Sequence, residues 1–152
     1  DAHIMTGGAG KGRGMENAEA LAQFQNRTNP AHVVNFSMFL HKEVPLYQDI
    51  RQGTFVPADE LETIREEYHL IERIAPEKAG ANILYDGFHD FIHVRVRGHL
   101  PGDKEKMLAK LNGIIQEYEG KEPVYSFVQG ECPDLEYCDD GKAVWDMDRK
   151  TS

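Results

Sequence analysis

The clearest β-strand pattern in the sequence is the run His32-Val33-Val34-Asn35-Phe36-Ser37-Met38-Phe39-Leu40-His41. Its even-numbered positions from 34 to 40 are all apolar, whereas most of the odd-numbered positions from 35 to 41 are polar. Successive side chains of a strand point to opposite faces of a sheet. The pattern therefore predicts a strand over 32–41 whose even-numbered side chains face a hydrophobic core.

Helical and strand patterns alternate on the C-terminal side of this strand. The expected elements are a helix over 57–74, strands over 83–85 and 91–98, a helix over 103–120 and a strand over 124–128. This order predicts an α+β domain of the ferredoxin-like type, a split βαβ unit (βαββαβ) with an antiparallel sheet. Both helices would cover one face, and the strands over 32–41 and 91–98 would form the central pair. A short N-terminal helix over 17–25 and a C-terminal extension after Gly130, with an edge strand near 143–145, would flank the unit.

Residues 1–14 have a different composition from the rest of the chain. Five of these residues from Gly7 onward are glycine, a composition typical of a flexible linker. Parts of the segment resemble an epitope used in expression vectors, and Met15 has the character of a natural initiator. We therefore expect a vector-like flexible leader over 1–14 and a single domain over 15–152. The loop lacks the spacing of a phosphate-binding P-loop, and no strand is expected before it.

The composition excludes several classes of protein. The chain has 152 residues with 17 basic and 26 acidic side chains, a formal net charge of -9, which argues against nucleic acid as a partner. No apolar run is long enough to span a membrane, so we expect no membrane association. Without a signal peptide after Met15, a cytoplasmic location is expected. Cys132 and Cys138 are too few for a disulfide scaffold, and whether they pair stays open.

The polar face of the predicted sheet is the first candidate site. In the expected topology Arg95 and Arg97 would lie beside Asn35, an arrangement that favours a carboxylate or phosphate of a small molecule. The connection over 42–56 is long enough for a catalytic lid, a surface excursion or an oligomer arm, and it would contribute Tyr47. A face that is simply solvated is the alternative interpretation.

The same face is also a candidate subunit interface. Phe39 and Phe91 would leave aromatic surface in water there, which favours association. We therefore expect a homodimer or larger homo-oligomer.

Three histidines are candidates for proton transfer. His41, His89 and His93 could act as general acids and bases, because imidazole titrates near neutral pH. His89 and His93 could share a metal ion only if the chain bends between them, so no metal site is expected and surface histidines are the alternative. No motif for an organic cofactor is present, and none is expected.

Two functions remain open at this stage. The first is a small oligomeric ligand-binding or accessory protein that binds an anionic small molecule on the open sheet face. The second is a cofactor-free acid–base enzyme (isomerase, cyclase or oxygenase type) of the dimeric α/β-barrel kind that uses the histidines. This second hypothesis rests partly on analogy between folds.

Overall fold

The computed structural model describes residues 1–127, 136–137 and 143–144. Its elements in chain order are β1 (Ala2–Thr6), α1 (Gly14–Thr28), β2 (His32–Ser37), α2 (Pro45–Gln52), α3 (Glu60–Arg73), β3 (Ile83–His89), the 3-10 turn η1 (Asp90–Ile92), β4 (Val94–Leu100), α4 (Lys104–Tyr118), β5 (Glu136–Tyr137) and β6 (Ala143–Val144). Residues 132 and 138, the two cysteines, lie outside the described residues.

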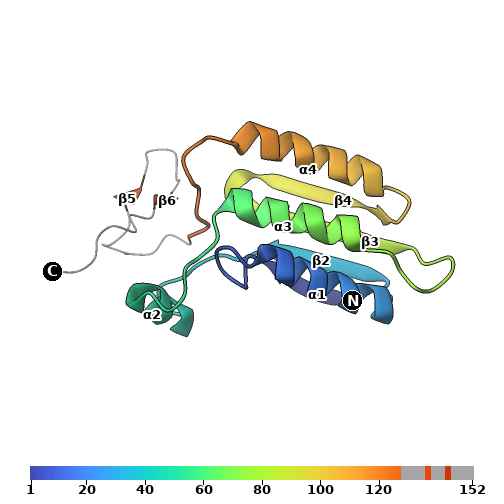
Figure 1. Ribbon diagram of the computed structural model, residues 1–152, viewed down its shortest axis with the longest axis horizontal. Helices are drawn as coiled ribbons and strands as arrows, with labels where there is room; N and C mark the ends of the chain where they lie inside the picture. Colours follow the sequence, from blue (N-terminus) through green and yellow to red (C-terminus); the bar gives the residue numbers. More distant parts are fainter. Residues whose placement is uncertain (128–135, 138–142, 145–152) are drawn as a thin grey trace.

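The main sheet has four strands in the order β1-β2-β3-β4, so that each strand lies beside its neighbour in the sequence (Figure 1). The β1–β2 and β2–β3 pairs are parallel, and the β3–β4 pair is antiparallel. The expected mixed α+β class is confirmed. The ferredoxin-like arrangement is not confirmed, because the sheet is only partly antiparallel. The expected central pair is wrong, since β2 lies between β1 and β3 while β4 is an edge strand.

The predicted strand boundaries differ from those in the structure. β2 ends at Ser37, and Leu40 forms only an isolated bridge to Phe127, in the segment expected to be a strand over 124–128. The second strand runs to His89 rather than residue 85, and a 3-10 turn precedes β4. β6 pairs with β5 in a separate two-stranded sheet and does not extend the main one.

The three predicted helices are present, α1 begins before the expected residue 17 and α3 begins after the expected start, and one further helix was not expected. α4 closely matches the helix expected over 103–120. α3 begins after Asp59, whose side chain accepts a hydrogen bond from the N–H of Glu62 at 2.8 Å, so Asp59 rather than Pro57 marks the start. Pro45 opens α2 inside the segment expected to be a long loop, because proline suits the first turn of a helix.

β1 is formed by residues of the expected leader. Ala2–Thr6 pairs with 33–37 of β2 in parallel register, and Ile4 joins the main core. The expectation that no strand precedes the glycine-rich loop is therefore wrong. The physical reason is that β1 and α1 together form a βαβ unit with β2, which buries apolar side chains that a linker would leave exposed.

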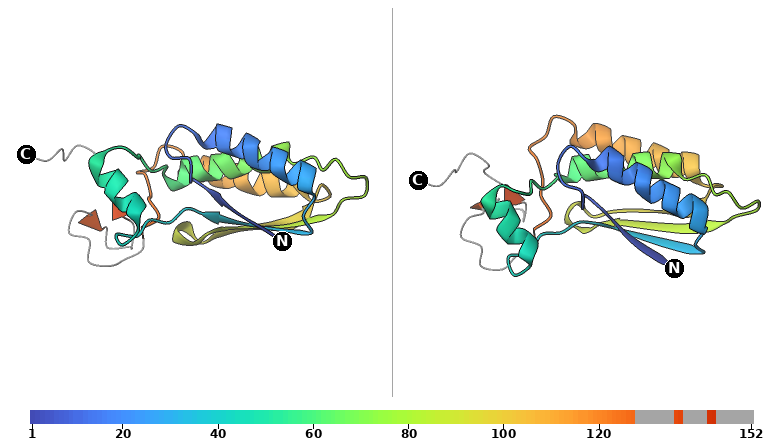
Figure 2. Two further views of the ribbon diagram at one scale, coloured as in Figure 1. Left: turned by 90° about the horizontal axis from the view of Figure 1, so that it is seen from below. Right: turned by 60° about the horizontal axis from the view of Figure 1, so that its bottom comes forward.

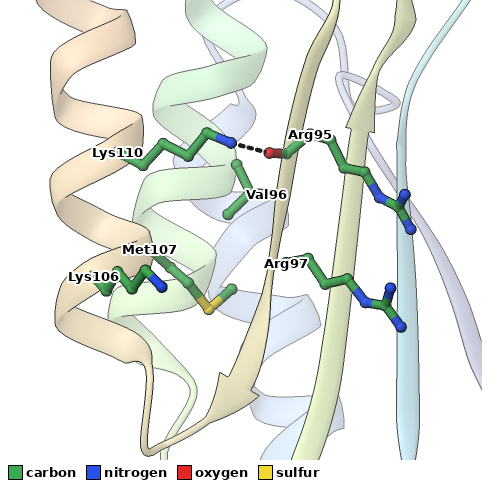
Figure 3. Close-up of a pocket in the computed structure, with 6 residues that line it drawn as sticks. All are labelled: Arg95, Val96, Arg97, Lys106, Met107 and Lys110. Carbon is green, nitrogen blue, oxygen red and sulfur yellow. Dashed lines mark hydrogen bonds between the residues drawn. The ribbon is translucent and has the colours of Figure 1, made fainter.

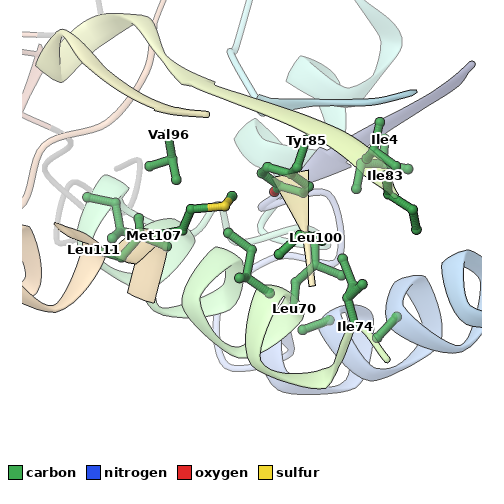
Figure 4. Close-up of a cluster of buried hydrophobic side chains, with 14 of the residues drawn as sticks. Ile4, Leu70, Ile74, Ile83, Tyr85, Val96, Leu100, Met107 and Leu111 are labelled. Atoms are coloured by element: carbon green, nitrogen blue, oxygen red, sulfur yellow. The ribbon is translucent and has the colours of Figure 1, made fainter. Parts of the chain in front are cut away.

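The domain has two layers, with α1, α3 and α4 covering one face of the sheet (Figure 2). The core between the layers contains Leu70 of α3, Ile74 directly after this helix, Met107 and Leu111 of α4, and Tyr85 of β3 (Figure 4). A smaller apolar cluster surrounds α2. Among the described residues, no helix is long and apolar enough to cross a lipid bilayer.

β2 is turned the other way from its predicted orientation. Val33, Asn35 and Ser37 are buried beneath the helices, whereas Val34 and Phe36 lie toward the uncovered face. Phe36 stacks there on Phe88 of β3, with ring centroids 5.6 Å apart. The hydrophobic alternation gave the wrong face because Asn35 and Ser37 find buried hydrogen-bond partners on α3, as polar groups in a core require.

Candidate functional site

A glycine-rich loop, residues 7–14, connects β1 to α1 at the carboxyl ends of the parallel strands. Gly7, Gly10 and Gly12 adopt positive φ angles of 83°, 81° and 78°, which L-residues with side chains rarely adopt. In open α/β sheets, ligands bind at this edge, outside the carboxyl ends of the strands. The loop therefore occupies the position at which a binding site is expected in such a fold.

Packing explains some of the glycines but not Gly8. A Cβ atom at Gly10 would lie 2.8 Å from the carbonyl oxygen of Val56, and one at Gly14 would lie 2.9 Å from Oε2 of Glu66. Gly8 is exposed, has no positive φ, and its Cβ would meet nothing closer than the Met5 oxygen at 3.8 Å. The fold does not need glycine at this position, so its missing side chain leaves the loop surface open to close approach.

The first turn of α1 begins directly after this loop. Arg13 stands at the N-cap position and no side chain caps the helix. The first N–H groups of an α-helix have no partner within the helix, and they carry partial positive charge that attracts anions. Lys11 and Arg13 are exposed beside them, and Arg13 also bonds Glu16 at 2.9 Å. Unpartnered peptide N–H groups and two exposed basic residues thus adjoin one another at the start of α1.

Two carboxylates of α3 accept hydrogen bonds from main-chain N–H groups of the glycine-rich loop. Glu66 Oε2 accepts a hydrogen bond from the N–H of Gly7 at 2.9 Å, and Glu66 Oε1 accepts one from Asn17 at 2.6 Å. The N–H of Gly12 donates to the carboxylate of Glu62. Burial raises the pKa of Glu66, and the bonds from Asn17 and Gly7 offset part of this effect. Glu62 and Glu66 of α3 therefore fix the loop in place, and the N–H groups of Gly7 and Gly12 already bind carboxylate oxygens.

A buried ionic cluster lies at the end of β3. Nδ1 of His89 is 3.0 Å from Oε2 of Glu60, and Nε2 is 2.9 Å from Oε2 of Glu67. The exposed fractions of these three side chains are 0%, 2% and 0%. Burial alone would lower the pKa of His89, but the hydrogen bonds to Glu60 and Glu67 outweigh it and raise the pKa to about 10. His89 is thus an imidazolium cation between two carboxylates.

Three further side chains complete the hydrogen bonds of the two glutamates. Ser37 donates to Oε1 of Glu60 at 2.8 Å, while Tyr85 and Asn35 donate to Oε1 of Glu67 at 2.8 and 3.1 Å. The cluster therefore joins β2, β3 and α3 through charge-assisted bonds. Because its members are buried, it has no surface for a substrate and serves to hold the strand ends in place.

The structure does not assemble the three candidate catalytic histidines into one group. His41 follows β2, and its Nδ1 accepts a hydrogen bond from the N–H of Glu43 at 3.1 Å. His93 is exposed at the end of η1 with a positive φ of 54°. Since both ring nitrogens of His89 bond glutamates, it makes no hydrogen bond to His41 or His93.

The candidate ligand-binding residues are also separated. Arg95 and Arg97 lie on the uncovered face, whereas Asn35 lies on the face beneath the helices. Tyr47 is buried in the cluster around α2 with Leu40 and Phe127. Phe91, expected on the open face, belongs to η1 instead.

Both arginines already have a carboxylate partner within the chain. Arg95 makes two hydrogen bonds to Asp86 of β3, at 2.8 and 2.6 Å, and Nε of Arg97 is 3.7 Å from the same carboxylate. The bonds from Arg95 lower the pKa of Asp86. The guanidinium of Arg95 also lies over the ring of Phe88, 4.7 Å from its centroid. An anionic ligand here would compete with Asp86 for the arginines.

The sequence pattern missed the buried glutamates. It predicted an apolar stripe that began at Leu61, whereas the buried face of α3 includes Glu60, Ile64, Glu67 and Ile71. The seven-residue spacing of the two glutamates, in phase with the isoleucines, is the signal that could have found them. Among the residues that the structure describes, no group of three histidine, cysteine or acidic side chains is arranged to hold a metal ion.

Comparison of the chain with family models, with curated proteins and with solved structures finds no match. The geometry of the loop and of the buried cluster is therefore the basis for a functional proposal.

Proposed function

We propose that this protein binds a small molecule through a phosphate group, held by the glycine-rich loop between β1 and α1. The observation that carries the proposal is Gly8, an exposed glycine that neither backbone conformation nor packing requires. At such a position the missing side chain permits a ligand to approach the peptide N–H groups closely.

The surroundings of Gly8 support an anionic ligand. The uncapped first turn of α1 offers N–H groups and the positive end of its dipole. Lys11 adds a cation, and Arg13 adds a second one that would have to exchange its bond to Glu16 for the ligand. Phosphate combines negative charge with several acceptor oxygens, so it matches this set of donors better than a neutral group. We thus keep the ligand-binding role expected from the sequence and propose its site at the carboxyl end of β1 instead of on the open sheet face.

The alternative acid–base enzyme has less support. Its three histidines do not meet, and His89 is buried between Glu60 and Glu67. A general acid or base must reach the proton that it transfers, and His89 has no exposed surface with which to do so.

The test is a titration of the full chain with inorganic phosphate, ribose 5-phosphate and adenosine monophosphate, followed by amide NMR. We expect at least one probe to shift the resonances of residues 8–15 in the parent protein. The variant Gly8→Val should lose this response and keep the fold, because Gly8 is exposed and a Cβ atom there meets nothing closer than the Met5 oxygen at 3.8 Å. The matched control Gly113→Val, in a part of α4 with open space around it, should bind as the parent does. Binding by Gly8→Val at the parent's affinity would refute the proposal. The proposal would also be refuted if none of the three probes shifted the amide resonances of residues 8–15 in the parent.

A second variant tests the electrostatics of the same site. Glu62 places a carboxylate on the N–H of Gly12 and so repels an incoming phosphate. Replacing Glu62 with Gln should raise the affinity for the responding probe roughly two- to fivefold, as expected for one exposed charge. Unchanged affinity would show that the phosphate does not bind near this side of the loop.

A further inference from the structure

The outer edge of β4 and the adjoining side of α4 form a groove of about 400 Å³. It is lined by Arg95, Val96, Arg97, Lys106, Met107 and Lys110. Lys106 and Lys110 extend from α4 toward the strand, while the guanidinium groups of Arg95 and Arg97 point away from α4 (Figure 3). This groove is separate from the glycine-rich loop, because the loop belongs to β1 at the opposite edge of the sheet.

The main chain of β4 offers hydrogen-bonding groups to this groove. The carbonyl oxygen of Arg95 accepts from Nζ of Lys110 at 2.5 Å, and the N–H of His99 donates to Asp103 at 2.8 Å. Both residues therefore direct their peptide groups away from β3. Arg97 lies between them and shares this direction, because alternate residues of an antiparallel strand face the same side. Among the described residues, no turn, loop or cap bond of the main chain involves the N–H or C=O of Arg97.

The charges on the groove differ in sign from the charge of the whole chain. The sequence carries a net charge of -9, yet four of the six residues that line the groove are cations. A strand laid along β4 would direct alternate side chains toward the lysines of α4 and toward the arginines on the uncovered face. Acidic residues on the helix side would meet Lys106 and Lys110. On the other side they would meet Arg95 and Arg97, which share the single carboxylate of Asp86 and so keep a net positive charge. Basic residues would meet like charge on both sides.

We propose that β4 is the docking site for an acidic, extended segment of a partner protein, which adds to the sheet as a fifth strand. Main-chain bonds at Arg97 would give the segment its register, and the cations on both faces would select its charge. Lys110 covers the carbonyl of Arg95 in the free protein, which protects the edge from unselective pairing. Its side chain is exposed, so it can turn from this carbonyl to an acidic residue of the incoming segment.

The experiment measures binding of a fluorescent peptide of mixed glutamate and valine to the full chain by anisotropy. A second peptide of the same sequence carries N-methylated amides, which keep its charge but cannot pair with a strand. We expect the first peptide to bind and the second to bind at least about tenfold more weakly. Addition of salt should weaken binding of the first peptide.

Charge-reversal variants locate the site. Lys106→Glu with Lys110→Glu should weaken binding of the peptide by about tenfold or more. Lys78→Glu with Lys121→Glu makes the same change of net charge outside the groove and should leave the affinity nearly unchanged. All variants are first checked by circular dichroism, and amide NMR of the parent should show shifts at residues 95–99.

Three results would overturn the proposal. Equal binding of the N-methylated peptide would mean a nonspecific basic patch. Equal losses of peptide affinity in both double variants would mean that the net charge of the chain, and not this groove, determines binding. No binding of the peptide, together with a change of oligomer mass in the Lys106 and Lys110 variant, would assign the edge to a second copy of this chain.

Discussion

Replacing His89 with Gln should remove most of the stability that the buried ionic cluster provides. In the parent protein the imidazolium lies 3.0 and 2.9 Å from two carboxylates that are almost fully buried. Without it Glu60 and Glu67 face each other with no cation between them. Removal of one partner from a buried ion pair costs about 3–5 kcal/mol. A loss of this size is a large part of the 5–15 kcal/mol that is typical of a domain.

The raised pKa of His89 also predicts how the stability difference between the parent and His89→Gln changes with pH. The pKa of His89 rises from 6.5 to about 10 on folding, so the folded chain holds one more proton than the unfolded chain between these values. The contribution of His89 is therefore complete below pH 6.5 and is lost as the pH rises through 10. Over this window the free energy of unfolding of the parent, relative to the variant, should fall by about 1.4 kcal/mol per pH unit.

Urea unfolding of both proteins across this pH range is the assay. We expect the gap between parent and His89→Gln to be about 3–5 kcal/mol near pH 7 and to close toward pH 10. Nitrogen NMR of the imidazole ring in the parent should show both ring nitrogens protonated at pH 8. A gap that does not change with pH, or a neutral ring at that pH, would refute the imidazolium assignment.

Three further predictions concern packing, assembly and metal content. Gly87→Ala would place Cβ 1.9 Å from Oε1 of Glu67, so we expect a loss of roughly 1–3 kcal/mol in urea unfolding, whereas Gly113→Ala in open space should gain up to about 1 kcal/mol. Phe39, which follows β2, is 53% exposed, and light scattering should give a dimer or larger mass for the parent that falls in Phe39→Ser. A monomer mass for the parent at high micromolar concentration would contradict the expected association. Elemental analysis of the purified protein should find less than about one tenth of an equivalent of zinc, iron or nickel, and a stoichiometric metal would contradict this.

The sequence was sufficient to predict elements whose apolar spacing is regular. The helical spacing of Ile64, Ile71 and Ile74 predicted α3, and that of Met107 and Leu111 predicted α4. Alternation around Val96 predicted β4 and placed Arg95 and Arg97 correctly on the face away from the helices. In each case the buried positions are the apolar ones, so the spacing of apolar residues in the sequence predicts both the element and its buried face.

The rest could not be predicted because polar residues take core positions. Asn35 and Ser37 are buried through bonds to glutamates that lie more than 20 residues away, a pairing that local patterns do not contain. The same holds for β1, whose short strand is stabilised by pairing with β2 rather than by its own composition. The wrong face of β2 and the missed strand β1 also led to the wrong candidate site. The loop and the buried cluster both depend on the parallel pairing of β1, β2 and β3, which the sequence did not predict.

The bonds of Asn35 and Ser37 also decide between two possible positions of β2 in the sheet. A shift of this strand by one residue would turn Val34 and Phe36 toward the helices in place of Asn35 and Ser37, a more apolar inner face than the observed one. That misregistered sheet would leave Glu60 and Glu67 without the donors that β2 supplies. Buried charges lacking such partners are costly, so the glutamates of α3 penalise the competing alignment even though it would bury more apolar surface. The ionic cluster thereby makes one strand alignment the native one, a role that a wholly apolar interior could not perform for this sequence.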